Sequence, residues 1–168
     1  GGWLGGAKAQ EEVLCRSSAL YATLEGDPMY AHHAARPLPD STAWAILSPD
    51  VPVFRTDDGT PLDQPWPCSF LTSAAPYAPE VGQPKSGDLL QTRIHRVLAI
   101  ASAYGYTALV LGAWGCGAFH NSAKRTAEDF RQALETEFSG HFSDIVFAIT
   151  DWSQNRRYLG PFRDVFNA

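Results

Sequence analysis

Four apolar residues run directly into a glycine-rich loop in the stretch Ala108-Leu109-Val110-Leu111-Gly112-Ala113-Trp114-Gly115-Cys116-Gly117-Ala118-Phe119. The apolar periodicity predicts a helix before this stretch, from about Leu89 to Tyr104. It predicts another helix from about Asn121 to Phe138 and a further apolar strand over Ile145–Ile149. Helices that alternate with buried apolar strands are typical of a three-layer α/β fold. Such folds bind ligands at the carboxyl ends of their strands, which is where this loop begins.

The loop between the strand and the second helix predicts a phosphate site, because glycine backbone and a helix N-terminus together favour anions. It is no Walker loop, since no Gly-Lys-Ser/Thr follows. It is no dinucleotide fingerprint either, since Gly115 and Gly117 lack a third glycine at the required offset. The alternative interpretation is a tight strand-to-helix turn with Phe119 in the core.

A second glycine-rich segment ends in adjacent acids: Gly1-Gly2-Trp3-Leu4-Gly5-Gly6-Ala7-Lys8-Ala9-Gln10-Glu11-Glu12. Such a loop lets backbone N–H groups approach a ligand closely. A carboxyl group beside a bound sugar can protonate a departing glycoside. Both acids fall in the first turn of a helix predicted over 9–24, where the helix dipole favours negative charge. That position also suits a purely structural helix start with two solvated acids.

The rest of the first half is less regular. Residues 29–42 contain Pro37 and Pro39 and predict an irregular connection. Strand segments are predicted over 44–47 and 51–55, before an Asp-Asp-Gly turn, and over 68–73. The stretch 74–87 has no periodicity and predicts a functional or mobile surface loop.

Size and charge narrow the class of protein. A chain of 168 residues with 45% apolar residues can bury one sizeable core, so we expect a single domain over 1–168. The net charge of −5 argues against a nucleic-acid surface that works by counterion release. No apolar run approaches the length of a membrane span, which is about 18 residues or more.

The cysteines and histidines predict no metal site and no redox cofactor. Cys15, Cys68 and Cys116 are widely spaced, without a Cys-x-x-Cys pair, which favours a reducing cytoplasm. Cys116 lies between two glycines and is predicted to be a small packed residue, with a catalytic thiol as the alternative. His32, His33 and His120 lack a further ligand at metal spacing and are predicted to be surface or loop residues.

The segment 1–12 resembles the signature of the poly(ADP-ribose) glycohydrolases, which is three glycines, six to eight arbitrary residues and Gln-Glu-Glu. The segment 112–119 resembles the second, diphosphate-binding loop of that family. The segments 11–21 and 48–55 are similar to its bacterial-type branch. The resemblance implies a macrodomain-like fold, in which a mixed sheet flanked by helices binds ADP-ribose.

The resemblance also implies roles for individual residues. Glu12 would be the general acid, while Glu11 and Gln10 position ribose hydroxyls or the leaving group. Because two neighbouring acids resist joint ionisation, we expect the pair to favour one protonated carboxyl. Phe119 would pack beside the distal ribose. Backbone contacts to ADP-ribose would come from Gly1, Gly2, Gly115, Cys116, Gly117 and Ala118.

For four further candidate site residues the sequence leaves two interpretations open. Asp50 is predicted to cap a turn, with a substrate contact as the alternative. Trp152 follows the last predicted strand and would contact the adenosine half of the ligand or pack in the core or at its rim. Arg156 and Arg157 are predicted to be solvated or to lie at the rim of the site.

The function implied by the resemblance is hydrolysis of ribose–ribose bonds in poly(ADP-ribose), which reverses ADP-ribosylation and releases ADP-ribose. Removal of single ADP-ribose groups from a protein or nucleobase, or binding without cleavage, are the alternatives; a structural α/β domain is a further one. We expect a cytoplasmic, bacterial monomer that needs no cofactor. Because the chain begins inside the signature, the resemblance further implies that an N-terminal part with adenine contacts precedes it.

Overall fold

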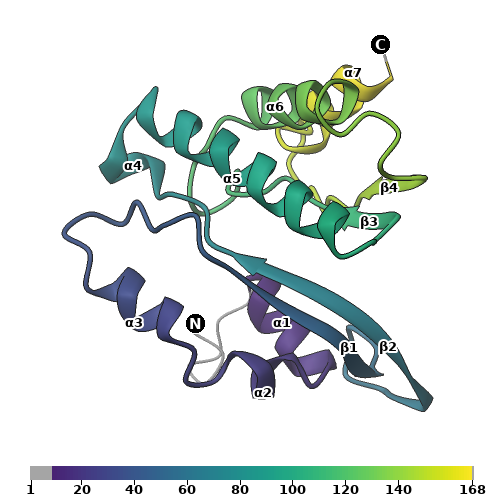
Figure 1. The fold of residues 1–168 in the computed structure, drawn as a ribbon. Helices are drawn as coiled ribbons and strands as arrows, with labels where there is room; N and C mark the ends of the chain where they lie inside the picture. The colour runs from purple at the N-terminus through teal and green to yellow at the C-terminus, as the bar shows by residue number, and fades with distance from the viewer. Residues whose placement is uncertain (1–8, 168) are drawn as a thin grey trace. The chain divides into compact units, whose positions relative to one another are not determined.

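The computed structural model describes residues 9–167 (Figure 1). The chain divides into two compact units. The first comprises Gly1–Ala35 and Trp44–Ser73, and the second comprises Arg36–Ala43 and Ala74–Ala168. No helix within residues 9–167 has the length and apolar character needed to cross a membrane.

The first unit begins with α1 (Gln10–Ser17) and α2 (Leu20–Leu24), where the sequence predicted one helix over 9–24. Ser18 interrupts that helix with an extended backbone. Its hydroxyl donates to the Leu14 carbonyl over 2.7 Å and accepts from the Leu20 N–H over 3.2 Å. The Ala19 N–H donates to the carbonyl of Pro52 in a strand over 3.0 Å. The prediction of one helix was therefore wrong, because a tertiary contact turns the chain away.

A third helix, α3 (Pro28–Ala34), lies where the sequence predicted an irregular connection. Oδ1 of Asp27 accepts from the Met29 N–H over 2.8 Å and caps the helix. Pro28 occupies the first turn, where a missing N–H costs nothing. The prolines therefore bracket a helix here, and only the residues after it are irregular.

A two-stranded antiparallel sheet completes the first unit. It pairs β1 (Ala45–Arg55) with β2 (Pro61–Ser73). The two predicted segments over 44–47 and 51–55 form one strand, which is interrupted by a register shift between Ser48 and Val51. β2 starts well before the predicted 68–73, because a strand at the edge of a sheet tolerates proline. Leu20, Leu24 and Val51 form the buried core of this unit.

The second unit follows the predicted order of helix, strand, helix and strand. α5 (Lys85–Ala103) precedes β3 (Ala108–Leu111), and α6 (Ala123–Glu135) precedes β4 (Asp144–Phe147). The strands pair in parallel, with Leu109 opposite Ile145. The prediction of α/β architecture is confirmed for this part of the chain.

The core of the second unit forms between α5, α6 and one face of the parallel strands. Its buried residues are Ala75, Leu90, Ile94, Leu98, Cys116, Ala127, Phe130, Ala133, Phe138 and Phe162. Leu109, Leu111 and Phe147 pack against this core from the strands. Their neighbours Val110 and Val146 are 76% and 57% exposed. These strands are therefore buried on one face only, whereas the sequence predicted buried strands.

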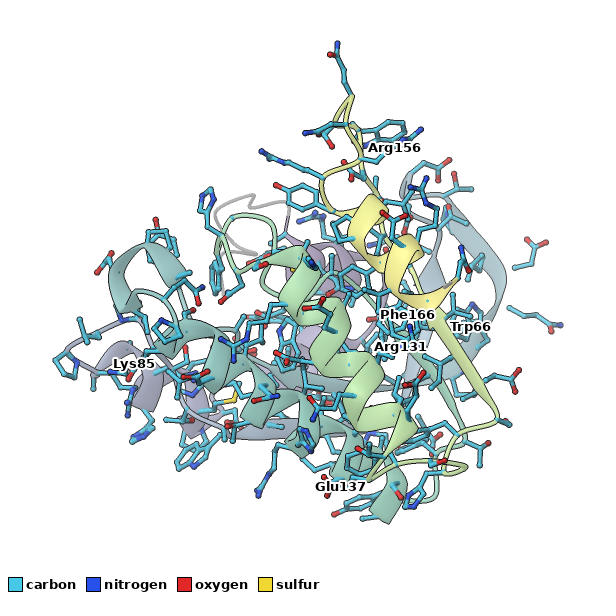
Figure 2. The ribbon with its side chains drawn as sticks, turned by 90° about the horizontal axis from the view of Figure 1, so that it is seen from above. Trp66, Lys85, Arg131, Glu137, Arg156 and Phe166 are labelled. Carbon is cyan, nitrogen blue, oxygen red and sulfur yellow. The ribbon has the colours of Figure 1, made fainter. Side chains whose placement is uncertain are left out.

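Two helices of the second unit were not predicted. α4 (Ala78–Val81) lies in the stretch 74–87, and α5 already begins there. α7 (Leu159–Phe166) packs on α6, where a guanidinium N–H of Arg131 donates to the Val165 carbonyl over 2.7 Å. The Phe166 ring lies 4.6 Å from that of Phe147; Arg131 and Phe166 are labelled in Figure 2.

Candidate active site

The two predicted acids lie in the first turn of α1, whose N-cap is Ala9. Glu12 is 7% exposed, whereas Glu11 is half-buried and Gln10 is exposed. The N-terminal position places both carboxyl groups at the positive end of the helix dipole. The alternative of two solvated acids is wrong for Glu12, because its side chain is buried.

Glu11 is held by a side chain from α3. The Tyr30 hydroxyl donates to Oε2 of Glu11 over 3.1 Å. Burial raises the pKa of Glu11, while the hydrogen bond from Tyr30 acts in the opposite direction. Burial and the neighbouring Glu11 carboxylate raise the pKa of Tyr30, so the phenol remains a donor. The result is a carboxyl group of fixed orientation that binds a proton more readily than an exposed one.

Cys15, on the same helix, lies in surroundings that disfavour its thiolate form. Burial, together with the charges of Glu11 and Glu12, raises the pKa of the Cys15 thiol to about 11. The thiol is therefore protonated at neutral pH.

A small pocket of about 100 Å³ opens beside Glu11, and Glu12 is not among the residues that line it. Gln10 and Glu11 form part of its wall, and α1, α2 and β2 supply the remainder: Leu14, Leu20, Phe70, Leu71, Thr72 and Ser73. Its lining thus mixes polar side chains from the helix start and from the end of β2 with apolar side chains. An arrangement of this kind suits a ligand with hydroxyl groups on a compact carbon frame.

The second predicted site is the glycine loop after β3, in the second unit. Gly115 has a φ of +73°, in the left-handed region. A Cβ atom there would lie 2.8 Å from the Ala75 Cβ and 2.9 Å from Nδ2 of Asn121. Only glycine fits that position. A Cβ at Gly117 would meet no atom within 4 Å, so that glycine faces open space.

The backbone N–H groups of the loop differ in what they can bind. The Cys116 N–H donates to the Ala113 carbonyl over 3.1 Å. Among residues 9–167, no acceptor receives the N–H groups of Gly115, Gly117 and Ala118. Gly117 and Ala118 are exposed, so their N–H groups can reach an anion.

Cys116 and Phe119 take opposite positions in the loop. Cys116 is 3% exposed, and its Sγ lies 3.4 Å from the Trp114 carbonyl. Burial raises the pKa of its thiol, and the prediction of a small packed residue is confirmed. Phe119 is 41% exposed, so the alternative interpretation of a core Phe119 is wrong. Its ring meets the Tyr77 ring edge to face, with centroids 5.8 Å apart.

Sequence reasoning missed Asn121, which it read only as the start of a helix. The side chain is 5% exposed and donates through Nδ2 to the carbonyls of Pro76 and Gly115, over 2.9 and 3.1 Å. Its Oδ1 accepts from the Ser86 hydroxyl over 2.6 Å. The helix itself starts later and is capped by Ser122, whose Oγ accepts the Arg125 N–H. An Asn directly before a Ser cap was the only signal.

The segment after β4 is ordered by Asp151. Oδ2 of this carboxylate accepts the N–H groups of Tyr158 and Leu159 over 2.7 and 2.9 Å, and Oδ1 accepts that of Ser153 over 3.0 Å. Burial alone would raise the pKa of Asp151, but these hydrogen bonds lower it below its usual range. Trp152 next to it is 92% exposed, so the alternative of a core tryptophan is wrong.

The remaining candidates are surface residues. Arg156 and Arg157 are exposed, and the Arg157 guanidinium lies 4.6 Å from the centre of the Tyr158 ring. Asp50 is exposed at the register shift of β1, with a φ of 51°. His32 and His120 are also exposed, and the His32 ring stacks on Trp44 with centroids 4.7 Å apart.

The predicted site residues therefore fall into two groups. The structure brings Gln10, Glu11 and Glu12 together in the first unit and residues 115–119 together in the second. Gly1 and Gly2 lie outside the described residues. Across the described ranges, no group of three or more His, Cys, Asp or Glu side chains could hold a metal ion.

The comparisons with known proteins agree on one family. The model of the microbial-type PARG catalytic domain matches residues 1–56. The chain is 39% identical to poly(ADP-ribose) glycohydrolase (PARG) from Deinococcus radiodurans, solved in complex with ADP-ribose. The TM-score is 0.92, over 99% of this chain and 71% of that chain. This likeness supports the macrodomain-like α/β fold class.

Two structures of PARG from Thermomonospora curvata are similar as well. The one bound to the inhibitor ADP-HPD is 42% identical, with a TM-score of 0.92, over 98% of this chain and 64% of that chain. Another is 42% identical, with a TM-score of 0.93, over 99% and 63%. The chain therefore spans somewhat less than two thirds of the length of these relatives. A comparison with curated proteins finds no match.

Proposed function

Because this chain belongs to the microbial-type poly(ADP-ribose) glycohydrolase family, we propose that its protein hydrolyses ribose–ribose O-glycosidic bonds in poly(ADP-ribose) and releases ADP-ribose. The reaction class is that of a glycosidase. The relatives solved with ADP-ribose and with ADP-HPD support this class of ligand.

The observation that carries the proposal is the pair of carboxyl groups in the first turn of α1. Glu12 is buried, and Glu11 is fixed by Tyr30. A glycosidic bond breaks slowly in water because an alkoxide is a poor leaving group, so a carboxylic acid must donate a proton to the leaving oxygen. A buried carboxyl group can do so where bulk water is kept away.

In the proposed mechanism Glu12 donates its proton to the leaving ribose oxygen while positive charge develops on the anomeric carbon. The bond from that carbon to the oxygen breaks, and the departing chain leaves with the proton as a hydroxyl group. A water then attacks the carbon and gives a proton to Glu12, which restores the acid. Glu11 and Gln10 hold the ribose hydroxyl groups, and Gly1 and Gly2 approach the ligand with their backbone.

The glycine loop of the second unit binds the diphosphate in this proposal. The N–H groups of Gly115, Gly117 and Ala118 supply the donors, since that of Cys116 is already bonded within the loop. Cys116 contributes by packing under the loop. Phe119, partly exposed against Tyr77, offers its ring to the distal ribose.

We further propose that the partner is poly(ADP-ribose) or another ADP-ribosylated macromolecule and that the protein acts as a cytoplasmic monomer over one catalytic domain. The mechanism assigns proton transfer to carboxyl groups and needs no cofactor.

The test is release of free ADP-ribose by the full-length protein from two substrates, a poly(ADP-ribosyl)ated protein and a mono(ADP-ribosyl)ated one. We expect release from the polymer that is lost in Glu12→Gln and kept in Glu80→Gln, a matched change at an exposed position. Release from the mono-modified protein alone would favour a mono-ADP-ribosyl hydrolase. Binding of ADP-ribose without release from either substrate would favour a binding module.

A further inference from the structure

The glycine loop is held by a side chain to which the mechanism above gives no role. Asn121 lies two residues after the end of the loop and is buried. Its Nδ2 and its backbone N–H both donate to the Gly115 carbonyl, over 3.1 and 3.0 Å. The same Nδ2 donates to the Pro76 carbonyl over 2.9 Å. One residue therefore fixes the carbonyl of the loop's left-handed glycine and ties it to the segment before α4.

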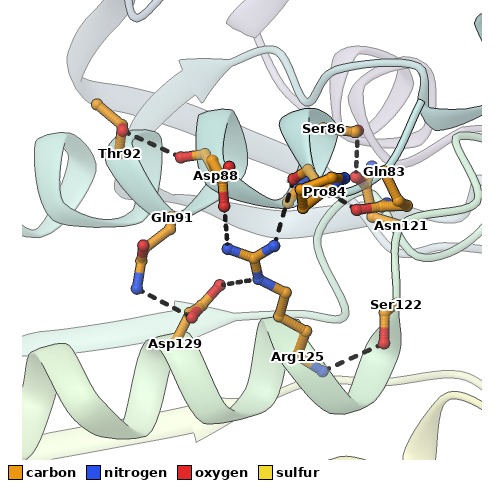
Figure 3. Close-up of polar contacts among 11 residues, drawn as sticks. Gln83, Pro84, Ser86, Asp88, Gln91, Thr92, Asn121, Ser122, Arg125 and Asp129 are labelled. Atoms are coloured by element: carbon orange, nitrogen blue, oxygen red, sulfur yellow. Dashed lines mark hydrogen bonds and ion pairs between the residues drawn. The ribbon is translucent and has the colours of Figure 1, made fainter. Parts of the chain in front are cut away.

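The orientation of this amide is set by a second buried side chain. Ser86, in the first turn of α5, is fully buried and donates to Oδ1 of Asn121 over 2.6 Å (Figure 3). Because Oδ1 accepts this bond, Nδ2 must face the two carbonyl groups. Ser86 and Asn121 thus form a connected pair in which each polar atom of the amide has a partner.

The first turn of α5, which carries Ser86, is held in place by Arg125. The Arg125 guanidinium packs over Gly87 so closely that an added Cβ there would overlap it. The same group donates to Asp88 over 2.5 Å and to the Pro84 carbonyl over 3.3 Å (Figure 3). The start of α5 is therefore a fixed support for the amide.

We propose that Asn121, oriented by Ser86, is a positioning residue that holds the N–H groups of the glycine loop in the geometry that binds the substrate diphosphate. The inference rests on the proposed function. The donors of Gly117 and Ala118 lie two and three residues after Gly115, so their direction depends on the backbone angles of that glycine. Glycine backbone is permissive, and donors that are already aimed bind an anion without an ordering cost.

The expected effect separates positioning from simple stabilisation. The loop would grip the diphosphate equally in the ground state and in the transition state, so its distortion raises KM and leaves kcat unchanged. A variant that merely unfolds more easily loses active enzyme, which lowers the apparent kcat and leaves KM as it was.

The test uses Asn121→Asp and Ser86→Ala in the full-length protein. Asn121→Asp keeps the size and the Oδ1 acceptor but turns an oxygen toward the carbonyls of Gly115 and Pro76. Ser86→Ala removes only the group that orients the amide and serves if the first variant does not fold. Leu98→Ala, a core change in α5 away from the loop, is the control for lost stability.

We expect Asn121→Asp to weaken ADP-ribose binding by about tenfold to a hundredfold, which is typical of displaced contact groups, and to raise KM for the polymer in parallel. We expect Ser86→Ala to weaken ADP-ribose binding and to raise KM as well, and we expect Leu98→Ala to change neither the affinity nor KM. Wild-type affinity and KM in a folded Asn121→Asp or Ser86→Ala protein would overturn the positioning role. Failure of the wild-type protein to bind ADP-ribose would instead overturn the proposed function.

Discussion

The Tyr30 hydroxyl donates a hydrogen bond to Oε2 of Glu11 over 3.1 Å and so ties α3 to the first turn of α1. Both groups belong to one unit and are partly buried. The bond favours the ionised form of a carboxyl whose burial favours the neutral form. The pKa of Glu11 therefore depends on the hydroxyl oxygen of Tyr30.

Tyr30→Phe removes that oxygen, so the pKa of Glu11 rises further. If the ionised Glu11 holds the ribose hydroxyls, the acid limb of kcat/KM against pH moves to higher pH in the variant. A pH–rate profile of polymer hydrolysis measures this, with Tyr104→Phe, at an exposed position, as the control. Superimposable acid limbs for Tyr30→Phe and the wild type would contradict the role given to this bond.

Glu11→Gln tests the raised pKa through stability. A carboxyl whose folded-state pKa lies above its ordinary value of 4.5 supports the fold below that pH, and this support is lost as pH rises through the folded-state pKa. The free energy of unfolding of Glu11→Gln should therefore rise relative to that of the wild type as pH increases above about 4.5. Urea titrations at several pH values measure the difference, with Glu80→Gln as the control. A constant difference across this range would show that burial does not disfavour the Glu11 charge.

Gly115→Ala should destabilise the second unit by about 1–3 kcal/mol, because a residue other than glycine is strained in the left-handed region. The close approach of the new Cβ to Ala75 acts in the same direction. Gly117→Ala is the matched change, and we expect it to stay within about 0.5 kcal/mol because the position is open. Urea unfolding compares the two. Equal effects would mean that the loop does not need the positive φ of Gly115.

Asp151→Asn should loosen α7. The hydrogen bonds that hold the folded-state pKa of Asp151 below 3.8 stabilise the protein above that pH, and this stabilisation is lost as pH falls through the lowered pKa. The wild type should therefore be more stable than the variant at neutral pH, and the gap should shrink below about pH 4. Thermal unfolding across pH measures it, with the exposed Asp164→Asn as the control. A gap that does not change with pH would contradict this account.

The sequence predicted the elements whose apolar residues follow a simple period. α5, β3, α6 and β4 lie close to their expected ranges, because Leu90, Ile94 and Leu98 repeat at helical spacing and the strands are short apolar runs. The acids of α1 were found because they follow a glycine-rich segment in the sequence. The glycine loop was found because it directly follows an apolar run. Their placement in α1 and after β3 agrees with that expectation.

What the sequence did not reveal depends on contacts distant along the chain. Ser18 breaks a periodic helix only because Ala19 pairs with Pro52. α7 begins where Asp151, seven residues before Tyr158, accepts its first N–H groups. Asn121 is joined to Ser86 across 35 residues. None of these partners leaves a local pattern, because a hydrogen bond between residues that are distant in the sequence has no period.

The central claim is that Glu12 is the general acid, and single-turnover hydrolysis of poly(ADP-ribose) by Glu12→Gln tests it most directly. Glutamine keeps the shape of the buried side chain but has no proton to donate to the leaving oxygen. The account predicts that the chemical step slows by about 10²–10⁴-fold while the Kd of ADP-ribose stays within about threefold of the wild type. A Glu12→Gln protein that binds ADP-ribose and cleaves the polymer at the wild-type rate would contradict it.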